Sequence, residues 1–149
     1  VLFRSGPNVF QGYWKLPEKT AEEFRDGRWF ITGDMGAFDA QGYLSILGRA
    51  KDLVITGGFN VYPSEVEQVI WGHPAVQDCA VIGVPDDKSG EAVKVFVVKK
   101  DPNLTAQDVI KFAATELTGY KVPKHVEFRT DLPKTNVGKI LRRELRSGK

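Results

Sequence analysis

The sequence has few of the residues from which metal centres and covalent cross-links are built. It contains one cysteine and two histidines in 149 residues, so no internal disulfide can form. Cys79 lies beside the apolar run Ala80-Val81-Ile82, and we predict that it is a small buried residue. His73 and His125 have no partners at metal-ligand or catalytic-triad spacing. We therefore expect no metal site in this chain.

Long apolar runs and phosphate-binding loops are also missing. No apolar stretch approaches the ~20 residues that span a bilayer, and no charged-then-apolar signal segment is present. A single cysteine fits a reducing compartment, so we expect a cytoplasmic protein with no membrane span. Neither G-x-x-x-x-G-K-[ST] nor G-x-G-x-x-G occurs, which excludes these two nucleotide-binding loops.

Charge is nearly balanced overall but uneven along the chain. Lys and Arg number 21 against 19 Asp and Glu, for a net charge of +2. Residues 121–149 hold nine Lys/Arg and three Asp/Glu, a local charge of +6, which leaves about −4 for the rest. An anionic partner near this tail is therefore expected. Because aromatic residues do not interleave with the basic ones, we expect no nucleic acid.

The second two-thirds of the chain predict an α+β fold. Hydrophobic content of 42% is sufficient for a packed core. Apolar, β-branched runs predict strands at residues 78–84, 92–99 and 124–128. Helices are predicted after Tyr62-Pro63, after Thr105 with a capping box to Asp108, and over residues 140–145. The pattern indicates a small three-stranded sheet flanked by helices.

The first 50 residues predict a short, β-rich segment. A helix is expected over residues 18–24, with strands at 28–32 and 43–47. Residues 39–42 predict a hairpin turn, with Gly42 free to adopt a positive φ. So few residues make a poor core of their own.

Three motifs are spread over nearly the whole chain. They are Thr32-Gly33-Asp34, then residues 48–52 (GRAKD) with 57–67 (GGFNVYPSEVE), then residues 133–140 (PKTNVGKI). Together they resemble the C-terminal end of the adenylate-forming enzymes, a family of acyl- and aryl-CoA synthetases, luciferases and adenylation domains of peptide synthetases.

The resemblance implies a division at residues 48–52. Residues 1–50 are expected to be a remnant of an N-terminal AMP-binding domain that ends at a hinge, and residues 51–149 a mobile C-terminal lid. The chain is then expected to begin mid-protein, and our hypothesis is that residues 1–5, which fit the pattern poorly, are not native. The missing N-terminal domain is the expected partner and would carry the phosphate loop, the acyl pocket and the Mg²⁺ site.

Lys139 is the candidate catalytic residue. It lies in a polar loop beside Gly138 rather than on a helix face, and lysine carries its charge as a mobile point cation. In the resembled enzymes this cation stabilises the transition state in which a carboxylate attacks the α-phosphate of ATP. The alternative is an ordinary solvated lysine in a basic tail.

Two more residues are candidates for binding AMP, and one for the hinge. Asp34 matches a carboxylate that accepts both ribose hydroxyls, and Arg49 an arginine that contacts the ribose or phosphate. Lys51 matches the hinge residue on which the lid turns. The alternatives are a turn aspartate, a surface arginine and an ordinary charged pair of Lys51 with Asp52.

The glycine pair is the candidate CoA site. Gly57, Gly58, Phe59 and Asn60 match a loop along the pantetheine tunnel, where glycine permits close approach of a thin ligand. The alternative is a glycine turn between a strand and a helix. The wider motif is more similar to CoA synthetases than to peptide-synthetase domains.

The resemblance implies a C-terminal fragment of an ATP-dependent acyl-CoA synthetase, an AMP-forming acid–thiol ligase. The parent enzyme would activate a carboxylic acid, fatty or related, as acyl-AMP and transfer it to CoA, using ATP, CoA and Mg²⁺. The isolated chain is expected to be inactive. Two alternatives stay open: the lid of an adenylation or fatty-acyl-AMP ligase module acting with a carrier protein, and a non-catalytic domain that keeps the fold.

Overall fold

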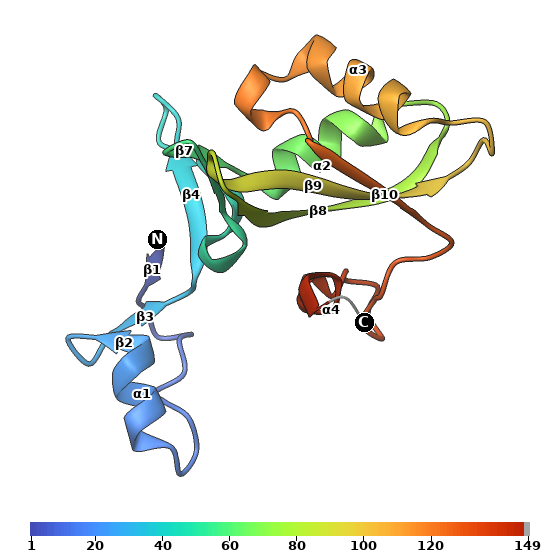
Figure 1. Ribbon diagram of the computed structural model, residues 1–149. Coiled ribbons are helices and arrows are strands. Elements are labelled where there is room, and N and C mark those ends of the chain that lie inside the picture. Colours follow the sequence, from blue (N-terminus) through green and yellow to red (C-terminus); the bar gives the residue numbers. More distant parts are fainter. Residues whose placement is uncertain (148–149) are drawn as a thin grey trace. The chain divides into compact units, whose positions relative to one another are not determined.

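A computed structural model of the protein describes residues 1–147 (Figure 1). The chain divides into two compact units, Val1–Lys51 and Asp52–Lys149. The sequence places the division one residue earlier, between Ala50 and Lys51.

The first unit consists of short strands and one helix. Its elements are β1 (Phe3–Arg4), α1 (Pro17–Glu23), β2 (Phe24–Arg25), β3 (Trp29–Ile31), β4 (Asp34–Phe38) and β5 (Leu44–Arg49). Strands β1 and β2 flank β3, and β4 pairs antiparallel with β5. The predicted turn is present, because the N–H of Asp39 donates to the carbonyl of Tyr43 and Gly42 has φ 87°. No residue of Val1–Lys51 is buried, in line with the expected lack of a core.

The second unit is a mixed sheet with helices, and the predicted α+β class is confirmed. It contains η1 (Ala50–Asp52, which begins in the first unit), β6 (Val54–Thr56), β7 (Phe59–Val61), α2 (Pro63–Trp71), β8 (Val76–Asp86), β9 (Gly90–Lys99), α3 (Ala106–Glu116), η2 (Gly119–Lys121), β10 (His125–Arg129) and α4 (Arg142–Ser147). The three predicted strands form as β8, β9 and β10.

The sheet is larger than the three strands expected. It has five strands in the order β10-β9-β6-β7, with β8 paired to β9. The additional pair, β6 and β7, is a hairpin closed by Gly57 and Gly58, and Thr56 joins it to the sheet opposite Gly90. Each run is only three residues long, which is why the sequence pattern did not show them as strands.

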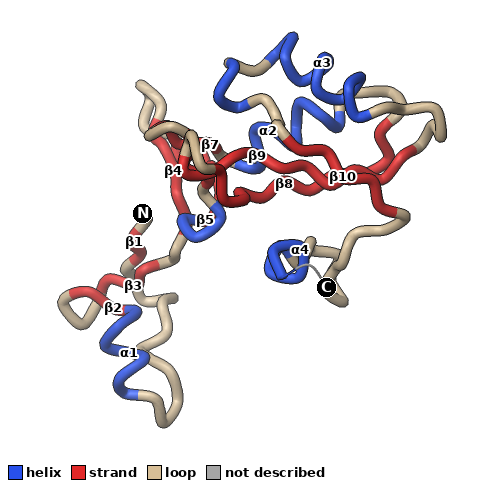
Figure 2. The backbone as a smooth tube through the Cα atoms, viewed as in Figure 1, coloured by secondary structure: helices blue, strands red, loops and turns tan. Residues whose placement is uncertain are grey.

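Both faces of this sheet are covered. Helices α2 and α3 lie on one face and α4 on the other (Figures 1 and 2). In β8, Cys79 and Val81 belong to the core under α2 and α3, whereas Ala80 and Ile82 belong to a second core that includes Leu145 of α4. Burial on both faces accounts for the unbroken apolar runs of β8 and β9. Cys79 is fully buried, as predicted.

Helix α3 starts with the predicted capping box. The N–H of Asp108 donates to Oγ1 of Thr105 (3.2 Å), and the N–H of Thr105 donates to Oδ2 of Asp108 (3.1 Å). These bonds satisfy two backbone donors that a helix N-terminus otherwise leaves open. No helix within residues 1–147 has the length and apolar character needed to cross a bilayer.

Candidate functional site

The candidate residues fall in both units. Asp34, Arg49 and Lys51 belong to the first unit, whereas Lys139 and the glycine turn belong to the second.

Lys139 lies in a small hairpin-like loop between β10 and α4. Lys134 and Ile140 form an antiparallel bridge at its base, and the N–H of Thr135 donates to the carbonyl of Lys139 (2.8 Å). The turn is closed by Gly138, whose φ of 80° lies in the left-handed region that favours glycine. The backbone of Lys139 is thus held by hydrogen bonds within its own loop.

The side chain of Lys139 is left available by this arrangement. Lys139 is exposed, and within residues 1–147 its ammonium has neither an ion pair nor a hydrogen bond. Lys134, by contrast, is paired with Asp78 (2.7 Å), and that hydrogen bond raises the pKa of Lys134. A fixed backbone with a free cation at its tip is suited to an anionic ligand supplied from outside this unit.

Asp34 and Arg49 come together across the β4–β5 ladder. They are directly opposed in register, and Nη1 of Arg49 lies 3.0 Å from Oδ1 of Asp34. The same Nη1 donates to the carbonyl of Thr32 (2.7 Å), and Oγ1 of Thr32 accepts from the N–H of Asp34 (3.0 Å). The Asp34 side chain still exposes about a third of its surface, 32%. The two residues predicted to bind AMP therefore lie side by side.

These residues line a pocket of the first unit with a volume of about 590 Å³, which Lys51 also lines. That volume is within the ~300–1,000 Å³ of small-molecule sites. Lys51 itself lies in η1, at the last position of the first unit. The predicted hinge residue thus directly follows two residues that line the pocket, Arg49 and Ala50.

The glycine pair forms the turn of the β6–β7 hairpin. Gly57 and Gly58 have φ of 58° and 84°, the two positive values that a type I′ turn requires. A Cβ atom added at either position would meet nothing within 4 Å. Phe59 stacks on Tyr120 with ring centroids 4.6 Å apart. The turn is thus open on its outer side and has an aromatic pair next to it.

The sequence did not identify an ionic cluster that surrounds the start of α4. Nη2 of Arg142 donates to both carboxylate oxygens of Glu67, at 2.8 Å each, and Nη1 lies 4.0 Å from Asp52. Nη2 of Arg146 donates to Asp52 at 2.9 Å. Glu67 ends the 57–67 motif, but Arg142 lies two residues beyond the 133–140 motif and 75 residues from Glu67, so no local pattern pairs the two.

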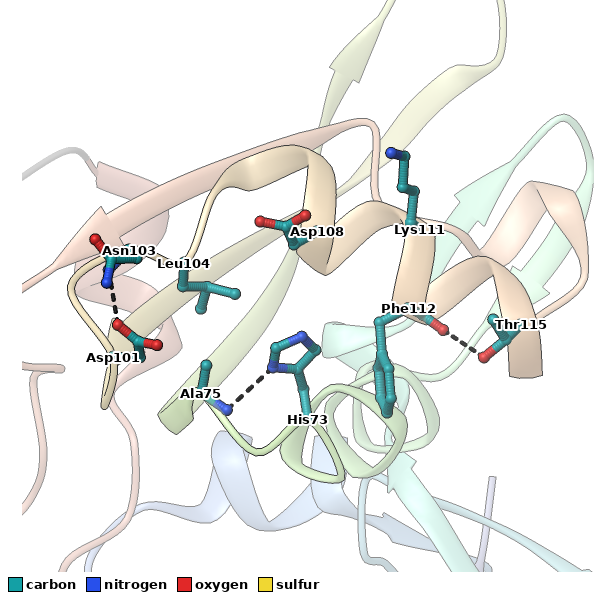
Figure 3. Close-up of a pocket in the computed structure, with 9 residues that line it drawn as sticks. All are labelled: His73, Ala75, Asp101, Asn103, Leu104, Asp108, Lys111, Phe112 and Thr115. Carbon is teal, nitrogen blue, oxygen red and sulfur yellow. Dashed lines mark hydrogen bonds between the residues drawn. The ribbon is translucent and has the colours of Figure 1, made fainter.

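A second pocket, of about 450 Å³, lies between α3 and the segment that follows α2 (Figure 3). Its imidazole and carboxylate side chains already accept hydrogen bonds from the local backbone. Nδ1 of His73 accepts from the N–H of Ala75, Oδ1 of Asp101 accepts from the N–H of Asn103, and Asp108 caps α3. We assign no site there. Within the described residues 1–147, no three His, Cys, Asp or Glu side chains are grouped to hold a metal ion.

A family model for the AMP-binding enzyme C-terminal domain matches residues 65–139. A long-chain-fatty-acid–CoA ligase of Escherichia coli O6:H1 is 57% identical over 141 residues, covering 95% of this chain and 25% of the relative. A feruloyl-CoA synthase of Amycolatopsis sp is 50% identical over 143 residues, covering 95% and 29%.

Solved structures are similar to this chain as well. ATP-bound MatB from Rhodopseudomonas palustris has a TM-score of 0.88 and 50% identity, covering 96% of this chain and 29% of that one. The chain spans between a quarter and a third of the length of the proteins that it matches.

Proposed function

Because the chain belongs to the family of AMP-binding enzyme C-terminal domains, we propose that it is the C-terminal part of an ATP-dependent acyl-CoA synthetase. In the parent enzyme a carboxylate attacks the α-phosphate of ATP, which gives acyl-AMP and releases pyrophosphate. The thiol of CoA then attacks the acyl carbonyl, forming the thioester and releasing AMP. The relatives named for long-chain fatty acids and for feruloyl-CoA support a carboxylic acid as substrate.

The observation that carries this proposal is the exposed, unpaired ammonium of Lys139 on a hydrogen-bonded loop. Adenylation brings a carboxylate and a phosphate together, and both are negative. A cation between them stabilises the charge that develops in the transition state, and losing one such contact commonly costs about 10²–10³ in rate. Lysine meets this need because it stays protonated as a compact point charge.

Asp34 and Arg49 are proposed to hold AMP. A carboxylate has two acceptor oxygens, one for each ribose hydroxyl. Arg49 orients Asp34 in this structure through the 3.0 Å ion pair and keeps further N–H donors for the ribose or the phosphate. Residues 1–50 would then be a remnant of the AMP-binding domain, and the unit from Asp52 onward a lid that turns at Lys51.

The glycine turn is proposed to guide CoA. Gly57 and Gly58 leave the outer side of the turn open, so a thin pantetheine arm could pass close to the backbone beside Phe59 and Asn60. The chain offers no carboxylate cluster for Mg²⁺ within residues 1–147. We propose that the metal, the phosphate loop and the acyl pocket belong to the part of the parent enzyme outside this chain.

Two measurements on the full-length enzyme test the proposal. The first is exchange of labelled pyrophosphate into ATP, which should depend on added carboxylic acid. The second is consumption of CoA thiol, compared with loading of a phosphopantetheinyl carrier protein. Loading of the carrier without reaction of CoA would favour an adenylation module, and no acid-dependent exchange at all would favour a non-catalytic domain. The isolated chain should support neither reaction.

A further inference from the structure

The loop that carries Lys139 is tied to the rest of its unit at both ends. Before the loop, Lys134 pairs with Asp78 of β8 at 2.7 Å. After the loop, Arg142 donates to both oxygens of Glu67 in α2. Only seven residues separate Lys134 from Arg142, so the loop has a side-chain contact to another element at each end.

The second tether is the more buried one. Only 7% of the Glu67 side chain and 25% of the Arg142 side chain are exposed. Glu67 also accepts the N–H of Val81 at 2.8 Å, so its carboxylate is held by β8 as well as by the guanidinium. Nε of Arg142 is buried and has no hydrogen-bond partner within residues 1–147.

This ion pair is a poor means of stabilising a fold. Removing two charges from water carries a large desolvation cost, and apolar replacements of buried pairs are often neutral or stabilising. Buried pairs can instead specify one position among several. Helix α4 is six residues long and is too short to be stable by itself. Its position depends on Leu145 in the core and on its arginines.

The elements that the arginines connect are the ones that the reaction needs. Arg142 comes three residues after Lys139. Asp52 comes one residue after Lys51, and it receives Arg146 at 2.9 Å and faces Arg142 at 4.0 Å. The cluster therefore links the first residue of the lid to the segment that carries the cation.

We infer that Arg142 and Glu67 are positioning residues for Lys139, and that Asp52 fixes the same cluster to the hinge end of the lid. This inference rests on the proposed function. Through its two nitrogens, Arg142 sets where the base of the Lys139 loop lies relative to α2 and Asp52. A displacement of about 1 Å in a reacting group can cost about 10²-fold in rate.

The test uses single-residue variants of the full-length enzyme and separates the two half-reactions. Arg142→Lys keeps the charge but loses the planar fork that contacts Glu67 with one nitrogen while the other faces Asp52. Glu67→Gln keeps an acceptor for Val81 but loses the charge. Acid-dependent pyrophosphate exchange measures the first step, and thioester formation from prepared acyl-AMP measures the second.

We expect both variants to lower kcat for exchange by tenfold to 100-fold, with KM for ATP within twofold of wild type. Thioester formation from acyl-AMP should stay within twofold, because that step does not use the cation of Lys139. The matched control is Arg129→Lys, which alters an arginine of similar exposure (27%) that pairs with Glu127 at 2.8 Å on β10. It should change neither step.

Other results would contradict either the positioning role of the ion pair or the proposed function. Equal losses in both half-reactions, or none in either, would show that the pair is only structural. A double variant, Arg142→Met with Glu67→Gln, guards against misfolding because it leaves no unpaired charge in the pair and keeps an acceptor for the N–H of Val81. If this double variant were folded and its acid-dependent pyrophosphate exchange matched that of wild type, positioning by the ion pair would be refuted. If Lys139→Ala also left exchange unchanged, the proposed function itself would fail.

Discussion

Substitution of Gly58 separates backbone strain from obstruction of a ligand. Its φ of 84° lies in the left-handed region, and an added Cβ would meet no atom within 4 Å. The cost of Gly58→Ala is therefore conformational only, about 1–2 kcal/mol. In a unit of about 100 residues, each kcal/mol lowers Tm by about 4–8 °C.

Gly58→Asn is the matched comparison, because asparagine enters the left-handed region more readily than alanine. We expect it to destabilise the chain less than Gly58→Ala, although its side chain is larger. Thermal unfolding followed by circular dichroism gives the order of the two Tm values.

The two variants should rank in the opposite order in catalysis. If the turn guides CoA, the larger Asn side chain obstructs more, so thioester formation from acyl-AMP in the full-length enzyme should fall further in Gly58→Asn than in Gly58→Ala. Acid-dependent pyrophosphate exchange should be unchanged in both. If the variant with the lower Tm also lost more thioester formation, whatever the size of its side chain, the assignment of this turn to CoA would be refuted.

Three further predictions concern stability and reactivity. Phe96→Ala, at a side chain with 1% exposure, should lower the free energy of unfolding in urea by about 3–5 kcal/mol; a loss below 1 kcal/mol would contradict the packing described. Hydrogen bonds from Thr105 lower the pKa of Asp108, so the stability they give is present above the unfolded pKa and is lost as pH falls through the lower folded pKa. The free energy of unfolding in urea should therefore fall less between pH 7 and pH 2 in Thr105→Ala than in wild type. An equal fall in both would contradict the role of Thr105 in lowering the pKa of Asp108. Burial, followed by two nearby carboxylates, raises the pKa of the Cys79 thiol; it should resist a thiol reagent at pH 8 until the chain is unfolded, and rapid labelling of the native chain would be the contrary result.

Local features of the fold were predictable from the sequence. The capping box at Thr105, the turn at Gly42 and the burial of Cys79 all follow from a few neighbouring residues, and the structure confirms each. The β6–β7 hairpin was not predicted, because two three-residue runs around Gly57 and Gly58 carry little periodicity. The alternative offered for that stretch was a glycine turn between a strand and a helix, which has the strand before the glycines but not the one after them.

Parts of the candidate site depend on contacts that no local pattern shows. Asp34 and Arg49 were each expected to contact AMP, but their ion pair follows from the β4–β5 register. Glu67 and Arg142 lie 75 residues apart, and the sheet brings them together. The roles of Lys139, the AMP ligands and the glycine turn remain predictions, because they concern ligands rather than the chain.

The central claim is that the cation of Lys139 acts in adenylation, and single-turnover kinetics of Lys139→Ala in the full-length enzyme tests it most directly. The control is Lys100→Ala, at an exposed lysine in the turn after β9. We predict that formation of acyl-AMP from the acid and ATP slows by about 10²–10³ in Lys139→Ala alone, while thioester formation from prepared acyl-AMP stays within twofold of wild type. Formation of acyl-AMP at the wild-type rate would contradict the claim.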